Sequence, residues 1–123
     1  MAANKILRFG PVALGIAAAN IINPPTISGG TGLAGTNANT YVILRHLRIV
    51  NKTASPVSFS FYIGGTGGAV AGTEFMGTAQ VVTANSYVDW YGLVRLDIAD
   101  FLTGLASAAT SLTLEGEGEI GVV

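Results

Sequence analysis

Three glutamates near the C-terminus alternate with glycines in a pattern that could bind a cation. Glu115, Glu117 and Glu119 have one glycine between each pair, so in a β-strand all three carboxylates lie on one face. Hard cations such as Ca²⁺ take several oxygen ligands. Carboxylates on one strand face are about 7 Å apart, which is too far to share one ion without a bulge. We therefore favour charge protecting an edge strand, or ion pairs with another subunit, over a metal site.

The single histidine, His46, stands between Arg45 and Arg48 in the strongest strand pattern of the chain. A Ser-His-Asp triad in a hydrolase needs a nucleophile motif such as Gly-x-Ser-x-Gly, which the sequence lacks. We expect His46 to be packed or hydrogen bonded. The two-residue period of a strand puts Arg45 and Arg48 on opposite faces, where each is expected to meet a carboxylate of this chain or of a partner.

Three aspartates, Asp89, Asp97 and Asp100, are the remaining candidates for acid–base chemistry. Glycoside hydrolysis uses a pair of carboxylates on either side of the scissile bond. A position in a turn or at a helix cap explains Asp97 and Asp100 equally well. The chain also has no cysteine, which excludes thiol nucleophiles and Cys-based metal sites. We predict no enzymatic activity, no catalytic residue and no bound metal.

The dinucleotide-binding pattern Gly-x-Gly-x-x-Gly occurs twice, at residues 30–35 and 116–121. In a nucleotide site these glycines follow a strand and open a helix whose N-terminus binds the pyrophosphate. The first match is preceded by Pro24-Pro25, and the second carries two glutamates that would repel a phosphate. Because the chain has 17 glycines, such matches arise easily. We predict no nucleotide and no other cofactor.

Trp90, flanked by Tyr87 and Tyr91, is the one aromatic cluster outside the expected core. Exposed aromatic rings can stack on sugars, so a carbohydrate-binding platform is one interpretation. The other, which we favour, is a core tryptophan between tyrosines at a subunit interface, where aromatic residues are enriched. In a strand, Trp90 shares a face with Val88, while the two tyrosines lie on the opposite face.

The composition is unusually poor in charge. The 123 residues are 50% hydrophobic and 11% charged, with a net charge of −1 and a mean hydropathy of +0.54, whereas soluble domains average about 25% charged residues. Residues 9–44 and 53–73 contain no charged side chain. The sequence has no cluster of basic residues that would predict nucleic-acid binding. No apolar run reaches the roughly 18 residues of a membrane span. Burial of the surface in an assembly is the leading interpretation.

The N-terminal section, residues 1–25, is apolar and ends at Pro24-Pro25. A basic start and a small-residue run resemble a signal peptide, but Gly10, Pro11 and Gly15 interrupt its apolar part. We expect residues 1–25 to form an arm or first strands docked on a neighbouring subunit, followed by a β-sandwich over residues 26–123. Deletion of residues 1–22 is then expected to leave the remainder folded.

The most distinct strands are Thr40–Asn51 and residues 56–63, joined by a turn at residues 52–55. In the first, simple alternation places Tyr41, Ile43, Leu47 and Ile49 on one face and Val42, Leu44 and Val50 on the other, so apolar residues line both faces. The second alternates apolar residues with serine and tyrosine, which predicts a half-buried antiparallel strand. Asn51-Lys52-Thr53 is also a formal glycosylation sequon, but nothing else in the sequence supports a secretory context.

Weaker strand patterns follow. They cover residues 73–83, 87–91, 93–97, 112–114 and 120–123. Residues 97–109 alone have helical spacing, through Ile98, Phe101, Leu102 and Leu105, for one or two turns. The sequence therefore predicts a single all-β domain, a β-sandwich or jelly-roll-like fold, with at most one short helix near residues 98–106.

The central segment resembles small β-rich virion structural proteins of tailed bacteriophages. The resemblance rests on Tyr41–Asn51 (YVILRHLRIVN) followed by residues 53–65 (TASPVSFSFYIGG), a strand that turns through Thr, Ala and Ser into an alternating strand. Residues 83–88 (TANSYV) and 105–114 (LASAATSLTL) continue it. It covers roughly residues 36–121. It lies in the general residue pattern of the strands and turns and includes no diagnostic motif.

The resemblance implies a capsid decoration or head accessory protein, with a tail or baseplate component as the alternative. A second alternative, a carbohydrate-binding module, rests on the aromatic cluster of Tyr87, Trp90 and Tyr91. The expected partners are further copies of the chain, as a trimer, and the major capsid protein, in a virion assembled in the host cytoplasm; neither nucleic acid nor membrane is expected. We place the protein interface at apolar, aromatic and basic residues: Ile6, Phe9, Val12, Leu14, Ile16, Arg45, Arg48, Tyr87, Trp90 and Tyr91.

Overall fold

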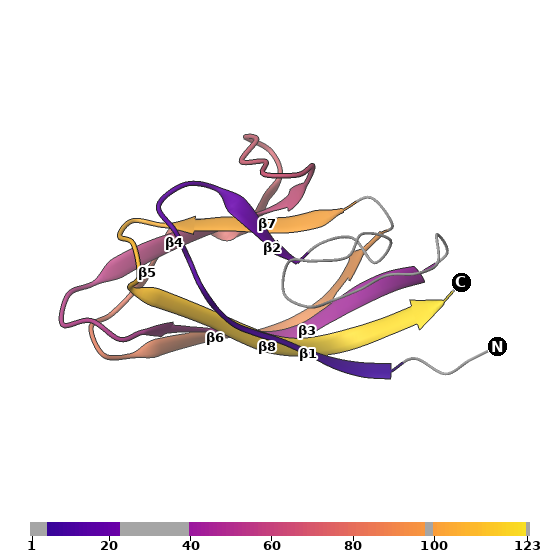
Figure 1. Cartoon of the computed structure of the whole chain (residues 1–123), viewed down its shortest axis with the longest axis horizontal. Helices are drawn as coiled ribbons and strands as arrows, with labels where there is room; N and C mark the ends of the chain where they lie inside the picture. Colours follow the sequence, from indigo (N-terminus) through magenta and orange to yellow (C-terminus); the bar gives the residue numbers. More distant parts are fainter. Residues whose placement is uncertain (1–4, 23–39, 98–99, 123) are drawn as a thin grey trace.

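The computed structural model describes residues 5–22, 40–97 and 100–122, and all regular structure in these residues is β-strand. Two antiparallel four-stranded sheets pack face to face as a β-sandwich (Figure 1). Sheet A has the order β1-β8-β3-β6 and sheet B the order β2-β7-β4-β5. The strands of sheet A are β1 Lys5–Ala13, β8 Leu112–Val122, β3 Thr40–Asn51 and β6 Tyr87–Leu96. Those of sheet B are β2 Ala19–Ile22, β7 Phe101–Ala106, β4 Val57–Gly64 and β5 Glu74–Val82.

The core lies between the sheets and is made by the inward face of each strand. In β4 the expected alternation is confirmed, since Val57, Phe59 and Phe61 are buried. Leu102, Leu112 and Leu114 are also fully buried, and they come from strands of both sheets. Burial of such side chains contributes about 1.5–3 kcal/mol each, so this shared layer holds the two sheets together.

The N-terminal section belongs to the sandwich itself. β1 pairs with β8 in sheet A, and β2 pairs with β7 in sheet B. Leu14, Ile21 and Ile22 are part of the chain's own core. The described part of residues 1–25 therefore forms the first strands, one at an edge of each sheet. Residues 23–25 lie outside the described residues.

A bulge in β3 changes which of its residues face the core. Leu44 pairs with Gly118 of β8 but His46 pairs with Glu117, so β3 has one extra residue at this point. Leu47 and Ile49 consequently point inward together with Leu44 and are fully buried. The faces expected from simple alternation were wrong after residue 44.

The helical alternative for residues 97–109 was also wrong, because residues 101–106 form β7 in the interior of sheet B. Its inward residues are Leu102, Gly104 and Ala106, and a side chain at Gly104 would collide with Phe61 and Ile21. A central sheet position therefore outweighs the helical spacing. The strand patterns at residues 87–91 and 93–97 belong to one strand, β6. Those at residues 112–114 and 120–123 belong to one strand, β8.

Asn51 joins the turn between β3 and β4 to the end of β5. Its side-chain amide N–H groups donate to the carbonyl oxygens of Ser55 (2.8 Å) and Val82 (3.0 Å). Its Oδ1 accepts from the backbone N–H and the hydroxyl of Thr53, at 2.9 and 2.7 Å. Asn51 is 1% exposed, so the sequon residue is a buried structural element rather than a surface acceptor of glycans.

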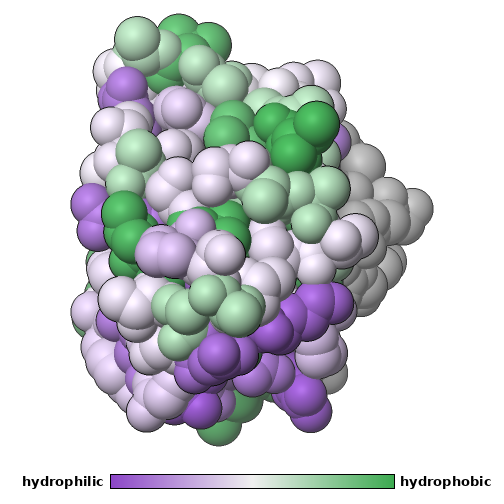
Figure 2. Space-filling model, turned by 90° about the vertical axis from the view of Figure 1, so that its left-hand side faces the viewer, coloured by the Kyte–Doolittle hydropathy of each residue, from purple (hydrophilic) through white to green (hydrophobic). Residues whose placement is uncertain are grey.

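The charged residues are distributed very unequally between the sheets. Sheet A carries nine of the chain's thirteen Lys, Arg, Asp and Glu residues, whereas Glu74 is the one charged residue in the strands of sheet B. Figure 2 shows strongly hydrophilic residues gathered in its lower part, the side on which sheet A lies in Figure 1. In the described residues, no helix is long and apolar enough to cross a membrane.

Candidate functional site

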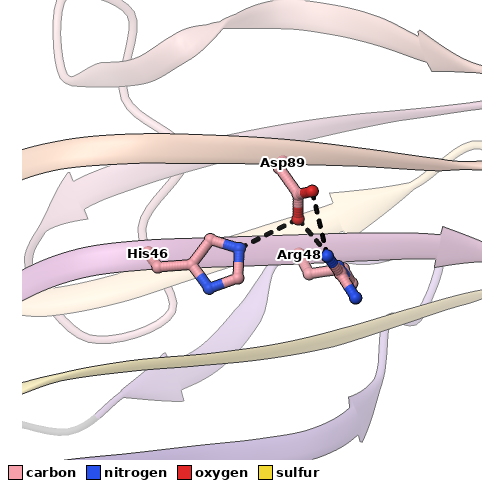
Figure 3. A network of polar contacts seen from close by, with 3 residues as sticks. All are labelled: His46, Arg48 and Asp89. Carbon is pink, nitrogen blue, oxygen red and sulfur yellow. Dashed lines mark hydrogen bonds and ion pairs between the residues drawn. The ribbon is translucent and has the colours of Figure 1, made fainter.

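The outer face of sheet A carries a compact polar network centred on Asp89 of β6 (Figure 3). Arg48 of β3 binds it in a bidentate manner, with Nε–Oδ1 at 2.8 Å and Nη2–Oδ2 at 3.1 Å. His46 Nε2 donates to the same Oδ1 at 2.9 Å. The cross-strand register, which pairs Arg48 with Asp89, fixes this geometry.

The network favours the ionised carboxylate. Hydrogen bonds from Arg48, the largest cause, and from His46 lower the pKa of Asp89 to about 2. The same hydrogen bond raises the pKa of the Arg48 guanidinium above its ordinary value. Asp89 is therefore a permanent negative charge at neutral pH, held between two donors. It is suited to hold the two β3 side chains in place, and unsuited to act as a proton donor or acceptor.

Two tyrosines complete the network on the β6 side. The ring of Tyr91 stacks on His46, with centroids 4.5 Å apart and planes at 7°. The guanidinium of Arg48 lies over the ring of Tyr87, 4.6 Å from its centroid. Tyr87 and Tyr91 remain 55% and 70% exposed. Each tyrosine thus has one ring face occupied by its own chain.

The three glutamates of β8 also face this side of sheet A. Glu119 forms an ion pair with Arg45, and Glu115 lies 4.0 Å from Arg8. β8 is an interior strand between β1 and β3, so the expectation of an edge strand was wrong, and these two partners belong to the same chain. No group of three His, Cys, Asp or Glu side chains within the described residues could hold a metal ion.

This face has two depressions, and His46, which follows the bulge, lines both of them. Between the pairs made by Leu44 and those made by His46, β8 advances by one residue, β3 by two and β6 by three. The first depression, about 290 Å³, is lined by Arg8, His46, Arg48, Glu115, Gly116 and Glu117. The second, about 570 Å³, is lined by Arg45, His46, Tyr91, Gly92, Leu93 and Glu117.

Both arginines of β3 lie on this outer face, contrary to the expectation that they point to opposite faces. The extra residue at the bulge brings Arg45 to the side of Glu119, while Arg48 reaches Asp89. Each arginine meets a carboxylate, as expected, and in both cases the carboxylate is in this chain. Asp89 was considered only for catalysis, although its cross-strand position opposite Arg48 decides its role.

The remaining interface candidates separate into inward and outward residues. Trp90 packs against the core and makes an edge contact with Phe75, at 5.0 Å between centroids. Leu14 lies in the core, and Val12 packs against it. The exposed candidates are Ile6, at 84%, and Ile16, at 66%. Phe9 lies in β1, but its side chain falls outside the described residues.

The site is therefore a mutually satisfied charge network on an open sheet face, with two shallow depressions beside it. Its described residues supply ion pairing, stacking and hydrogen bonding. Among the residues that the structure describes, no serine or threonine hydroxyl forms a hydrogen bond with His46, whose ring contacts Asp89 and Tyr91. Compared with models of protein families and with curated proteins, the chain matches none.

Proposed function

We propose that the protein is a non-catalytic structural protein of a tailed-phage virion, a decoration protein that binds the outside of the capsid. The observation that carries the proposal is the unequal distribution of charge between the two sheets. Sheet A presents a network of charges, while the strands of sheet B contain one charged residue, Glu74. This asymmetry supports a domain that turns one face to water and the other to a shell.

The candidate contact surface is formed by β5 and the loop at residues 65–73. Val70 and Val81 are 63% and 59% exposed there. Most of the surrounding residues are Gly, Ala and Thr. The carboxylate of Glu74, the one charge in this segment, accepts the backbone N–H of Gly72 at 2.8 Å.

An uncharged surface is well suited to burial because few ions lose their hydration on contact. Apolar area contributes about 25 cal/mol per Å² before the cost of association. Many copies on one shell gain further from multivalency when they are linked in oligomers. Ile16, in the connection between β1 and β2, is a further exposed apolar residue for such contacts.

The location is tested by immunogold electron microscopy of the phage particles whose genome encodes the chain, with an antibody against the purified protein. We expect label over the head. Label confined to the tail or baseplate would instead establish the alternative, a tail structural component. Particles that carry no label would overturn the virion proposal.

The contact face is tested with two matched substitutions. Val81→Asp places a charge on the sheet B surface, and Ile6→Asp places one on β1 of sheet A. Co-sedimentation with capsids that lack the protein is expected to fall at least tenfold for Val81→Asp and to stay near the wild-type level for Ile6→Asp. The reverse result would show that sheet A faces the shell.

A carbohydrate-binding module is the second candidate, and Tyr91 is the residue that favours it. Its exposed ring borders the depression of about 570 Å³ beside Arg45 and Glu117. Trp90 does not belong to this platform because it packs inward. Glycan binding by the purified protein that is lost in Tyr91→Ala, with an unchanged fold, would support this candidate over the virion role.

A further inference from the structure

A β-sandwich has four edge strands, and in this chain three of them are interrupted. β1 contains Pro11, which has no N–H to donate, within a register shift between Phe9 and Val12. β2 is only four residues long. β5 has positive φ angles at Met76 and Ala79, together with a register shift relative to β4. Such features prevent an edge from pairing with another strand.

The fourth edge, β6, has a register shift relative to β3 between Tyr91 and Val94, but it has none of the other features. It is ten residues long, contains no proline, and has no residue with positive φ. Its side chains alternate regularly, with Val88, Trp90 and Val94 packed towards the core. No strand lies beyond it in the described part of the chain. An edge of this kind is a template for pairing with a further strand.

The side chains next to this edge are also unusual for a solvent-exposed strand. Tyr87, Tyr91 and Leu93, on its outer face, are 55%, 70% and 70% exposed. Elsewhere on sheet A, the charged network occupies the same face. Of the four large apolar or aromatic side chains of sheet A that are exposed in the described residues, three lie along β6 and the fourth, Ile6, lies on β1. These three side chains lie beside the edge that has neither a proline nor a positive φ, and this coincidence indicates where a strand would be added.

We propose that β6 pairs with β6 of a second copy of this chain. The two strands run antiparallel about a two-fold axis at Gly92, which joins two copies of sheet A into one eight-stranded sheet. Identical strands related by a two-fold axis always pair in this antiparallel manner. The surface is then self-complementary, with Tyr91 of one copy opposite Leu93 of the other.

Charge selects this register among the alternatives. With the axis at Gly92, Asp89 lies opposite Arg95 of the second copy, and the reverse pair forms on the other side of the axis. An axis at residue 93 would place Asp89 opposite Asp97 of the second copy, and like charges in that position destabilise a sheet. An axis at residue 91 would place Asp89 opposite Leu93. Only the axis at Gly92, among these three, joins opposite charges and uses nearly the whole of β6.

This inference identifies the surface through which copies of the chain associate in the proposed function. It does not require the proposed virion role to be correct. A two-fold strand pair predicts a dimer rather than the trimer expected from the resemblance. The dimer forms from the purified chain alone, so its test is separate from capsid binding. A dimeric protein absent from particles would refute only the virion proposal, and a monomeric protein found on heads would refute only the dimer.

The first test is the mass of the purified protein by sedimentation equilibrium over a wide concentration range. We expect a monomer–dimer equilibrium for the wild type. Arg95→Glu places a carboxylate opposite Asp89 and is expected to weaken the dimer at least tenfold. Lys52→Glu, a matched charge reversal in the exposed turn after β3, is expected to leave the equilibrium unchanged. Circular dichroism establishes that both variants are folded.

The second test reads the register directly, because the natural chain has no cysteine. Directly opposite residues in an antiparallel pair have Cα atoms about 4.5–5.5 Å apart, within the range of a disulfide. Tyr91→Cys, activated with Ellman's reagent, is mixed with Leu93→Cys, so that only the mixed disulfide forms. The matched control replaces Leu93→Cys with Val81→Cys, another exposed position, on β5.

We expect rapid cross-linking of residues 91 and 93 and slow cross-linking in the control. A wild-type protein that is monomeric at all concentrations, or trimeric, overturns the proposal. So does equal cross-linking in both mixtures, or a dimer whose mass and affinity are the same in Arg95→Glu. Each result is obtained with folded, full-length protein and without any capsid.

Discussion

At the scale of single residues, Asn51 illustrates how one buried side chain organises a loop region. Its four hydrogen bonds reach Thr53, Ser55 and Val82. We predict that Asn51→Ala lowers the free energy of unfolding by roughly 3 kcal/mol, because it removes the Asn51 partner of the Val82 carbonyl and of the Thr53 amide, and each such loss costs about 1–3 kcal/mol. The Ser55 carbonyl still accepts a hydrogen bond from the Thr53 hydroxyl. Urea denaturation of the two proteins measures the difference.

Asn20→Ala is the matched control for this prediction. Asn20 also makes two side-chain hydrogen bonds, to Thr66 and Gly67, but they are exposed. Water replaces exposed partners, so we expect a loss below about 1 kcal/mol. An equal loss in both variants would show that burial of Asn51 has no special role.

Asp89 gives a second residue-scale prediction, on the dependence of stability on pH. Its pKa is about 2 in the folded protein, against an ordinary value of 3.8. A lowered folded-state pKa stabilises the fold fully above the ordinary value, and the contribution disappears as pH falls through the folded-state value. We predict that the wild type is more stable than Asp89→Asn at pH 6 and that the difference shrinks between pH 4 and pH 2.

Urea denaturation at pH 6, 4, 3 and 2 measures this difference directly. Asn20→Ala, which removes no titrating group, should differ from the wild type by a constant amount over the same range. A gap between wild type and Asp89→Asn that stays constant down to pH 2 would contradict the assigned role of the Arg48 and His46 hydrogen bonds.

At the scale of elements, the contact of β8 with β3 requires a glycine at the bulge. A Cβ atom at Gly118 would lie 2.2 Å from the carbonyl oxygen of Ile43, a backbone atom that cannot rotate away. We predict that Gly118→Ala destabilises the protein by at least the roughly 1–3 kcal/mol typical of overpacking. Thermal unfolding followed by circular dichroism reports the change.

Gly64→Ala is the appropriate comparison for that variant. Gly64 ends β4, its φ is not positive, and a Cβ atom there would meet no other atom within 4 Å. We expect its midpoint temperature to stay close to that of the wild type. If Gly118→Ala were equally harmless, the close approach of β8 to β3 could not be the reason for a glycine at this position.

The strands of this fold differ in how well local sequence patterns predict them. The bounds of Thr40–Asn51 and the inward residues of β4 follow from local alternation and are confirmed. The bulge does not, because its cause is the different number of residues that β8 and β6 use beside β3, a non-local property. The ion pairs of Arg45 and Arg48 depend on that bulge, so the candidate site could be predicted only as a set of residue types.

At the scale of the whole molecule, the scarcity of charged residues is confined to sheet B, because most of the charged residues lie in sheet A. The charges of sheet A are bound to one another across strands, through Arg48 and Asp89 and through Arg45 and Glu119. Sheet B lacks them, and its outer side bears the loop at residues 65–73, held by the hydrogen bond from the Thr103 hydroxyl to the carbonyl of Gly68. Composition alone could not distinguish this arrangement from a surface on which the few charges are spread evenly over both sheets.

The N-terminal strands give the prediction at this scale. Deletion of residues 1–22 removes β1 and β2, one edge strand from each sheet, and takes Leu14, Ile21 and Ile22 out of the core. Loss of a single buried Leu or Ile side chain costs about 2–5 kcal/mol, and domains are stable by only about 5–15 kcal/mol. We therefore predict an unfolded product, in place of the folded remainder expected from the sequence.

Deletion of residues 1–4 is the control, because it retains both strands in full. We expect it to unfold cooperatively, like the chain without a deletion, whereas the larger deletion should give no cooperative transition and no near-ultraviolet circular dichroism. A folded product of the larger deletion would mean that sheets of three strands suffice, and that the N-terminal strands are available for a neighbouring subunit. The same experiment thus decides between an intrinsic role and a docking role for this segment.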